Sequence, residues 1–402
     1  MKISIGQSAT TAEKHAATEL QAHLARMTIA KSERLRFAVG PEAALAAGAL
    51  AKELNGLGDE GFVIRRAGDS IILSGAPGGK RGTLYAVFGF LDRILGCRWW
   101  TPDADFVPAG VRRIPKSFSF REIPDIELRE TDYWFRHDPK WMIANRTNMG
   151  GIPDEWGGGR GYAAFVHTMI GTLIPKDKVE AHPKWQAIVD GKPNPTQLCL
   201  SRPEVLAETI AGVRRVLKAH PDAEIVSVSQ MDNHMYCHCP ACAKIDARAG
   251  SPAGSMLTFV NKVAEVVEKE FPRVAVDTLA YLYTRKPPLG IRPRQNVIVR
   301  LCTFECDFLH PLDHSNNRPF MRDLEGWSRI CKRLYVWDYN ANFAHYTLPH
   351  PNWFVLADNM RLFHAHNVRG VFAEGSRTCT GGELAELKTW VLLKLMWNPS
   401  LD

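Results

Sequence analysis

Apolar residues alternate with serines at the start of residues 224–242, EIVSVSQMDNHMYCHCPAC, and the pattern then stops abruptly. Ile225, Val226 and Val228 predict a buried strand, because β-branched side chains suit a pleated surface. The residues at 230–233 are poor in strand propensity and rich in side-chain oxygen and nitrogen. An apolar strand that ends in a carboxylate and amides is typical of the rim of an α/β barrel, where functional residues lie.

Residues 1 to about 120 have the pattern of a small α/β unit. Two stretches carry apolar residues at helical spacing, and four shorter stretches predict strands, two of which pair as a hairpin around Ala67-Gly68-Asp69. A Pro-rich stretch through Pro124 follows, so we expect an accessory domain over residues 1–120. The expected helices span residues 12–27 and 83–95, and the expected strands span residues 2–6, 36–40, 61–66 and 70–74.

From residue 125 onward, strand and helix signals alternate, which is the pattern of parallel βα units. Eight units in about 275 residues match a (β/α)8 TIM barrel, which typically takes about 250 residues. A doubly wound open sheet is the alternative, but it normally has fewer strands and a Gly-rich first turn. We therefore predict an α/β fold in which a barrel over residues 125–402 follows the accessory domain. The expected strand ends lie near residues 133–134, 167–168, 199–200, 230, 281, 303–304, 337–338 and 373–374, and the expected helices span residues 203–219, 255–271, 319–331, 353–366 and 383–397.

Charge and hydropathy exclude two classes of partner. The chain of 402 residues carries a formal net charge of +7, but its lysines and arginines are scattered, so no nucleic-acid partner is expected. No apolar run approaches the roughly 18–20 residues of a membrane span, so no membrane association is expected. Met1 leads directly into a strand, with no signal peptide visible, and this leaves the compartment unknown. The oligomeric state is also unknown from the sequence.

Three of the nine cysteines, Cys237, Cys239 and Cys242, form the pattern C-x-C-x-x-C, flanked by His234 and His238. With a further thiol or an imidazole, they could complete a four-ligand zinc site. No second C-x-x-C follows, and a loop of reduced thiols or one disulfide are the simpler explanations. We assign no metal and no cofactor, and we expect any metal held here to be structural. The cysteines in or beside apolar stretches, where cysteine behaves as a small hydrophobic residue, are Cys97, Cys199, Cys302 and Cys331.

Carboxylates and aromatic side chains follow the predicted strands, at the rim where a barrel would gather them. Aromatic rings stack on the apolar face of a pyranose, while carboxylates and amides bind its hydroxyls. Two carboxylates can also act as general acid and as nucleophile or base on a glycosidic bond. The pattern therefore indicates a sugar site, and no G-x-S-x-G motif indicates a serine nucleophile. The predicted catalytic residues are Glu305, Asp232 and Glu374, and the predicted substrate-binding residues are His167, Asn233, Tyr281, Trp337, Asp338 and Tyr339.

Most of these residues also have a purely structural explanation. Asp232 can cap the turn after its strand, and Glu305 can belong to an ion pair. Glu374 has Arg377 nearby in the sequence as a partner, and Asp338 can make turn hydrogen bonds. The remaining structural explanations are a backbone hydrogen bond for His167 and core packing for Trp337 and Tyr339.

Several long segments, in order along nearly the whole chain, resemble a known family. They are GTLYAVFGFLDRILGCRWWTPD, FVHTM, AHPKWQAIVDGKPNPTQLCLSRPEV, VSVSQMDNHMYCHCPAC, LAYLYTRKPP, LCTFECDFLHPL, LYVWDYNANF, LPHPNWFVLADNMRLF and GVFAEG. With these segments the chain resembles glycoside hydrolase family 163, which is also described as the domain-of-unknown-function 4838 family. The first part of the chain is similar to the small α/β domain that precedes the barrel in β-hexosaminidases and α-glucuronidases.

The resemblance implies a retaining endo-β-N-acetylglucosaminidase whose partner is an oligosaccharide, the chitobiose core of an N-glycan. Such enzymes use the 2-acetamido group of the substrate as the nucleophile, an exception to the two-carboxylate scheme. The resemblance implies that Glu305 is the general acid, in an apolar setting that raises its pKa, and that Asp232 or Glu374 steers the acetamido group. The implied hydrogen-bonding residues are Asn233, Tyr281 and Tyr339, and the implied subsite walls are His167 and Trp337.

Other functions fit the same pattern. An exo-acting hexosaminidase or an α-glucuronidase-like enzyme would use the same barrel. A carbohydrate-binding protein without catalysis would keep the cleft and lose the chemistry. A zinc-dependent hydrolase would need the cysteine cluster. Relatives of this type are often exported, which the chain itself does not indicate.

Overall fold

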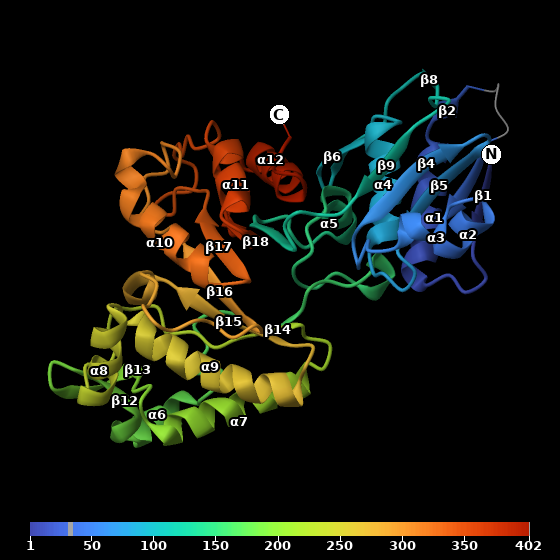
Figure 1. The fold of residues 1–402 in the computed structure, drawn as a ribbon. Helices are drawn as coiled ribbons and strands as arrows, with labels where there is room; N and C mark the ends of the chain where they lie inside the picture. Colours follow the sequence, from blue (N-terminus) through green and yellow to red (C-terminus); the bar gives the residue numbers. More distant parts are fainter. Residues whose placement is uncertain (31–34, 402) are drawn as a thin grey trace. The chain divides into compact units, whose positions relative to one another are not determined.

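The computed structural model describes residues 1–30 and 35–401, which form a mixed α/β protein of two compact units. The first unit comprises Met1–Gly159, Ala341–Pro349 and Gly375–Asp402, and the second comprises Arg160–Asn340 and His350–Glu374. Each unit has its own sheet and its own helices (Figure 1). Within the described residues, no helix combines the length and the apolar character needed to cross a membrane.

A five-stranded mixed sheet organises the first unit. The elements of this unit are β1 (Lys2–Ile5), α1 (Thr11–Ala25), β2 (Thr28–Ile29), β3 (Arg36–Val39), α2 (Pro41–Ala46), α3 (Ala51–Leu54), β4 (Phe62–Ala67), β5 (Ser70–Gly75), α4 (Gly82–Arg93), β6 (Arg98–Thr101), β7 (Ala104–Phe106), β8 (Val111–Arg112), β9 (Ser119–Glu122), β10 (Leu128–Asp132), α5 (Pro139–Asn145), η1 (Asp154–Trp156) and α12 (Ala385–Trp397). The sheet order is β1-β3-β5-β4-β9, and the predicted hairpin is the antiparallel β4–β5 pair. Helices α1 and α4 pack against each other and against this sheet.

The local sequence explains where α1 begins. The Thr10 hydroxyl accepts a hydrogen bond from the Glu13 backbone N–H, and the Glu13 carboxylate accepts one from the Thr10 N–H at 3.1 Å. This capping box satisfies two amide groups that a helix start otherwise leaves without partners. Ala16 and Leu20, on the apolar face predicted for this helix, are completely buried.

The second unit is built on parallel strands. Its elements are β11 (Tyr162–Ala164), α6 (Lys176–Ala181), η2 (Pro183–Trp185), β12 (Gln186–Val189), β13 (Lys192–Leu198), α7 (Pro203–Ala219), β14 (Ile225–Ser227), α8 (Pro240–Ala249), α9 (Ala253–Glu270), β15 (Ala275–Ala280), η3 (Leu282–Thr284), β16 (Val297–Cys302), η4 (Ser315–Asn317), α10 (Arg318–Ile330), β17 (Leu334–Tyr339), α11 (Leu356–Ala365) and β18 (Val368–Glu374). The largest sheet has seven strands, and the six from this unit follow the order β18-β17-β16-β15-β14-β11. Each neighbouring pair among these six is parallel.

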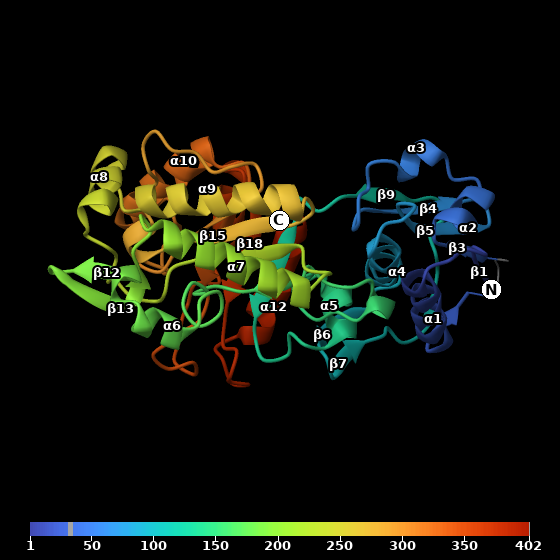
Figure 2. The same cartoon turned by 90° about the horizontal axis from the view of Figure 1, so that it is seen from below.

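Helices pack on one face of this curled sheet. Helices α7 and α9 contact each other and lie beside the region of β15 (Figure 2). Helix α9 also contacts β15 and β16, and α7 contacts β11. Strands β14, β15 and β16 are buried along their whole length. Their sequences are mostly apolar, as expected for parallel strands that are buried in the fold. The carboxyl ends of these parallel strands therefore share one edge.

The described residues do not form the predicted closed barrel of eight parallel strands. Strand β13 ends at Leu198, just before the third predicted strand end, and it pairs with β12 in an antiparallel hairpin. Its sequence includes Pro193 and Pro195, which have no N–H to donate to a neighbouring strand. The result is a seven-strand half-barrel instead of a (β/α)8 barrel. The predicted domains, 1–120 and 125–402, stay a prediction, and the first compact unit also includes α12 from the end of the chain.

Candidate functional site

The carboxyl ends of β11 and β14–β18 place most of the predicted site residues along one edge of the half-barrel. Register and strand alternation decide which side chains share a face. In the β17–β18 pair, Tyr339 lies beside Glu374, and Trp337 lies beside Phe372. These four side chains therefore point to the same side of the sheet. Cys302 on β16 is the register partner of Trp337, so that strand continues the same surface.

Trp337 fixes the position of Glu374. The indole Nε1–H donates a hydrogen bond to Oε2 of Glu374 at 2.8 Å. Both side chains are half-buried, and the carboxylate is the last residue of β18. A neutral donor of this kind orients a carboxylate without neutralising its charge. The arrangement leaves Glu374 as an anchored acidic group at the strand edge.

Asp232 is tied to the same edge through Tyr281. Burial raises the pKa of Tyr281 above its usual value, and the nearby Asp232 carboxylate, which accepts a hydrogen bond from the tyrosine hydroxyl, raises it further. Tyr281 is 9% exposed, whereas Asp232 is exposed in the loop that follows β14. The hydroxyl thus stays protonated and acts as a donor to the carboxylate.

Tyr339 is affected by the charges of both carboxylates. Burial is the largest cause that raises the pKa of Tyr339. The nearby Cys302 and Tyr281 raise this pKa further, and so do the negative charges of Glu374 and Asp232. The Phe304 ring lies 5.7 Å from that of Tyr281 and 5.5 Å from that of Tyr339, and half of its surface is exposed. Two carboxylates, two phenols and an exposed ring therefore share one place at the strand ends.

His167 lies just after β11, beside this group of residues, and its backbone is strained. Val166 and His167 have φ angles of 27° and 51°, in a region that residues with a Cβ rarely adopt. The His167 ring nitrogen Nδ1 is 2.8 Å from the carbonyl oxygen of Gln230, and its ring lies 6.1 Å from that of Tyr281. The histidine therefore does satisfy a backbone carbonyl, and it also lies beside the phenol that binds Asp232.

Glu305 is not in the apolar setting that was expected for it. It lies in the turn after β16, and its side chain is 42% exposed. Its carboxylate forms an ion pair with Arg285 at 2.6 Å, and Arg285 also binds Asp323 at 2.8 Å. The guanidinium balances its charge, so the structural alternative for this residue is present in the fold. Glu305 still contributes to the electrostatic surroundings of Tyr281.

Asp338, one of the predicted substrate-binding residues, does not face the other predicted site residues. Side chains alternate along a strand, so Asp338 points to the opposite face from its neighbours Trp337 and Tyr339. It is buried, and its two oxygens accept hydrogen bonds from Thr303 at 2.9 Å and from Asn340 at 3.0 Å. Burial raises its pKa to about 6. Asp338 belongs to an internal network and does not join the group at the edge.

Asn233 takes part in the hydrogen bonds of its own loop. Its side-chain oxygen accepts hydrogen bonds from Gln197 at 3.1 Å and from the Met235 N–H at 3.0 Å. Gln197 also donates to the Met231 carbonyl at 2.8 Å and accepts from the Met231 N–H at 3.2 Å. Gln197, which sequence reasoning missed, thus joins the end of β13 to the loop that carries Asp232.

A buried charged pair fills the half-barrel behind the edge. Arg300 and Asp277, both completely buried, form an ion pair at 3.0 Å, and Arg300 also donates a hydrogen bond to the Tyr162 hydroxyl. The guanidinium lies 5.4 Å from the centre of the Phe165 ring and 5.9 Å from that of Trp337. The sequence signal was a single charge within each of two apolar strands, AVDTLA and VIVRLC. This pair supports the aromatic layer that carries Trp337.

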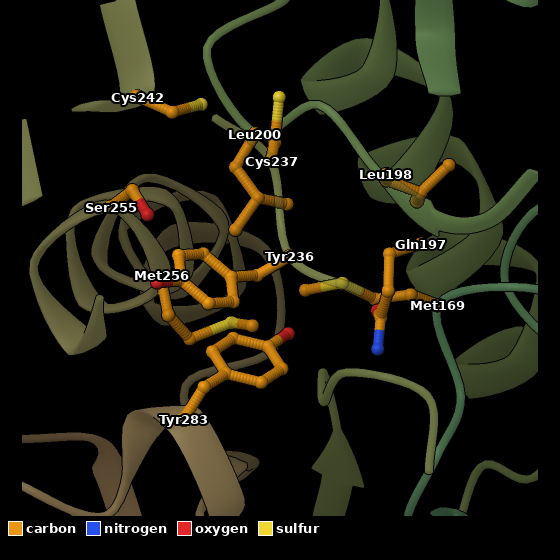
Figure 3. Close-up of a pocket in the computed structure, with 10 residues that line it drawn as sticks. All are labelled: Met169, Gln197, Leu198, Leu200, Tyr236, Cys237, Cys242, Ser255, Met256 and Tyr283. Carbon is orange, nitrogen blue, oxygen red and sulfur yellow. The ribbon is translucent and has the colours of Figure 1, made fainter. Parts of the chain in front are cut away.

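The cysteine pattern has a fourth member that was not expected. The sulfur atoms of Cys199, Cys237, Cys239 and Cys242 all lie within 4.8 Å of one another, and all four residues are buried. The two flanking histidines are exposed. A small cavity of about 10 Å³ lies beside Cys237 and Cys242 (Figure 3). Among the described residues, a second, partly exposed group with the spacing of metal ligands is Asp307, His310 and His314.

The sequence model of a domain of unknown function, DUF4838, matches residues 99–402, which is more than half of the chain. The chain belongs to the DUF4838 family. This confirms the predicted family under that name, and the narrower assignment to glycoside hydrolase family 163 stays a prediction. No curated protein matches the sequence of this DUF4838 protein.

Solved structures of glycoside hydrolases resemble this DUF4838 protein in fold. A family 89 glycoside hydrolase from Clostridium perfringens, in complex with its substrate GlcNAc-alpha-1,4-galactose, matches with a TM-score of 0.54, 10% identity, and coverage of 98% of this chain and 49% of that one. The same enzyme in complex with PUGNAc matches with a TM-score of 0.54, 10% identity, 98% of this chain and 50% of that one. A GH138 enzyme targeting pectin rhamnogalacturonan II matches with a TM-score of 0.43, 10% identity, 100% of this chain and 64% of that one. The chain therefore spans about half to two thirds of the length of these structures.

Proposed function

We propose that this DUF4838 protein is a glycoside hydrolase that cleaves a β-linked, N-acetylglucosamine-containing oligosaccharide. The observation that carries the proposal is the pair of anchored carboxylates at one edge, Glu374 bound by Trp337 and Asp232 bound by Tyr281. Exposed and half-buried rings beside them offer stacking surfaces for a pyranose. No cofactor is required for this chemistry.

In the proposed retaining mechanism, the substrate's own acetamido group is the nucleophile. Asp232 accepts the acetamido N–H, and Tyr281 holds Asp232 in place for that role. The acetamido oxygen attacks the anomeric carbon while the bond to the glycosidic oxygen breaks, and a protonated acid gives its proton to the leaving oxygen. The oxygen of a water molecule then bonds to the anomeric carbon and opens the oxazolinium ring, and one proton of that water restores the acid. Two displacements at the anomeric carbon retain its configuration.

The acid in this scheme is assigned to Glu374 in place of Glu305. A general acid must lie in a fixed orientation beside the bond that breaks. Glu374 is half-buried at the strand edge and is oriented by Trp337, whereas the Glu305 side chain is 42% exposed in a turn and pairs with Arg285 at 2.6 Å. Glu305, exposed in the turn after β16, is assigned to binding sugar hydroxyls.

The choice of sugar has support from a structural neighbour. The family 89 enzyme is described with GlcNAc-alpha-1,4-galactose and with 2-acetamido-1,2-dideoxynojirmycin, both of which carry a 2-acetamido group. Those ligands also favour a second candidate function, an exo-acting hexosaminidase. Product analysis separates the two. A branched N-glycan is cut within its core by an endo-acting enzyme, whereas terminal residues and aryl glycosides are released by an exo-acting one.

The test replaces the two anchored carboxylates one at a time. Glu374→Gln and Asp232→Asn should each lower kcat at least about a hundredfold, since each removes a group that acts on the reacting bond. Glu325→Gln, an exposed change on α10 where Glu325 pairs with Arg329, is the matched control and should leave kcat unchanged. Near-full activity in both test variants would overturn the assignment. Glycan binding without any product from the unmodified chain would identify a carbohydrate-binding protein.

A further inference from the structure

Four cysteines from separate parts of the second unit converge on one point. Cys199 follows the end of β13, Cys237 and Cys239 lie in the loop before α8, and Cys242 lies in the first turn of that helix. All four side chains are buried, and their sulfur atoms lie within 4.8 Å of one another. Figure 3 shows the sulfur atoms of Cys237 and Cys242 at the same end of a small cavity.

The spacing matches a tetrahedral metal site better than a disulfide. The Cys199 and Cys239 sulfur atoms are 3.6 Å apart, whereas a disulfide brings two sulfur atoms to about 2.05 Å. Four sulfur ligands at about 2.3 Å from a central zinc ion would lie about 3.8 Å from each other. The cysteines are all unpaired in the structure, so four thiols are present.

Donors around the sulfur atoms resemble the hydrogen bonds that support thiolate ligands. The Ile188 N–H donates to the Cys237 sulfur at 3.3 Å, and the Cys242 N–H donates to the Cys239 sulfur at 3.5 Å. The Ser201 hydroxyl lies 3.2 Å from the Cys199 sulfur and 3.4 Å from that of Cys239. Such contacts orient metal ligands and stabilise their negative charge. The amino terminus of the ten-residue helix α8 adds a favourable dipole.

We propose that Cys199, Cys237, Cys239 and Cys242 bind one structural Zn²⁺ ion. A complete set of four sulfur ligands favours zinc, and it leaves no open position for a substrate or a water molecule. The role is therefore to hold chain segments together. This assignment does not rest on the proposed glycosidase activity.

The ion would clamp the loop that carries Asp232. This loop begins after β14 and ends at α8, and Cys237 is five residues beyond Asp232. Cys199 anchors the other side, next to the β12–β13 hairpin, where Gln197 already binds Met231. Zinc thus makes the second tether between this hairpin and the loop. Asp232 is positioned through that tether, while the metal has no part in the chemistry.

Metal analysis of the purified chain tests the proposal directly. The protein, prepared without chelators, should contain about one zinc ion per chain, and Cys199→Ser should reduce this to less than roughly a tenth. Cys331→Ser changes a buried cysteine outside the cluster and should keep the full amount. Zinc-free wild-type protein, or a disulfide among the four cysteines in a non-reducing peptide map, would overturn the site.

Replacing zinc with Co²⁺ in the wild-type protein gives a second test, which does not depend on whether the cysteine variants fold. Wild-type protein produced with Co²⁺ should show sulfur-to-cobalt charge-transfer absorption and the visible bands of a tetrahedral site. An octahedral spectrum would overturn the four-sulfur assignment. Removal of the metal should accelerate hydrogen exchange over residues 228–239 and leave β18 unchanged. Unchanged exchange in the loop would contradict its role as a tether.

Discussion

Trp337 and Glu374, on neighbouring parallel strands, are joined by an indole-to-carboxylate hydrogen bond of 2.8 Å. The bond arises from the register of β17 and β18, in which Tyr339 lies beside Glu374 and Trp337 lies two residues earlier on the same face. An aromatic ring that could serve only as a stacking platform is therefore also the donor that orients an acid.

Replacing Trp337 with Phe should show how much the indole N–H contributes to kcat. The ring is kept, but the N–H that stabilises the negative charge developing on Glu374 as it gives up its proton is lost. A hydrogen bond to a charged group contributes about 1.5–3 kcal/mol. We expect kcat on an N-acetylglucosamine-containing glycan to fall roughly ten- to hundredfold, with KM little changed. Trp100→Phe, an exposed change in the first unit, is the control. Equal kcat in the two variants would show that Glu374 does not need the indole.

The Tyr281→Phe variant tests whether the Tyr281 hydroxyl is needed to hold Asp232, because it keeps the packing of the Tyr281 ring. The change removes the hydroxyl that donates to Asp232 and keeps the ring against Phe304. We expect kcat to fall at least about tenfold, while the thermal midpoint moves little. Tyr283→Phe, two residues away and stacked on Tyr236 at 4.8 Å, is the matched control. If both variants lose the same activity, the effect comes from packing of the turn and Tyr281 has no special function.

Much of this geometry could be predicted from the local sequence. The predicted helix at residues 203–219 has the same limits as α7, because its apolar spacing is regular and Pro203 marks its start. The ends of β15, β16 and β18 lie within one residue of the predicted ones, because apolar residues stop there and polar ones follow. Those signals depend only on residues close together in the chain.

The remaining features depend on contacts between residues far apart in the sequence. Arg285, which pairs with Glu305, lies twenty residues before it on another loop. Cys199 lies 38 residues before Cys237, so the pattern C-x-C-x-x-C gave no sign of its fourth member. The face of Asp338 is set by a single step of strand alternation, which the turn-like sequence YNAN obscures. None of these is visible in local periodicity.

Glu305→Gln distinguishes the two candidate acids. If Glu374 supplies the proton, Glu305→Gln should cost less than about tenfold in kcat, whereas Glu374→Gln should cost at least about a hundredfold. The physical reason is placement, because Glu305 is exposed in a turn and pairs with Arg285, whereas Glu374 is half-buried at the strand edge and oriented by Trp337. The kcat values of both variants on one substrate decide the matter. A larger loss for Glu305→Gln would assign the acid to Glu305, as the family resemblance implies.

Asp338 should make the unfolding free energy depend on pH. Burial raises the pKa of this carboxyl to about 6 from its ordinary value of 3.8, so the folded chain holds its proton more tightly than the unfolded chain does. The resulting stabilisation is fully present below pH 3.8 and is lost as the pH rises through about 6, a change of roughly 3 kcal/mol.

The Asp338→Asn variant cannot titrate at this position and should lack that dependence. Its amide nitrogen can donate to Thr303, whose hydroxyl then points to the Trp337 carbonyl, 3.5 Å away. Urea unfolding of both proteins at pH 4 and at pH 7 gives the comparison, since all other groups titrate in both. The wild type should lose more stability than the variant between these two values. An equal loss in both proteins would mean that Asp338 is ionised at pH 4 in the folded chain, held so by Thr303 and Asn340 despite its burial.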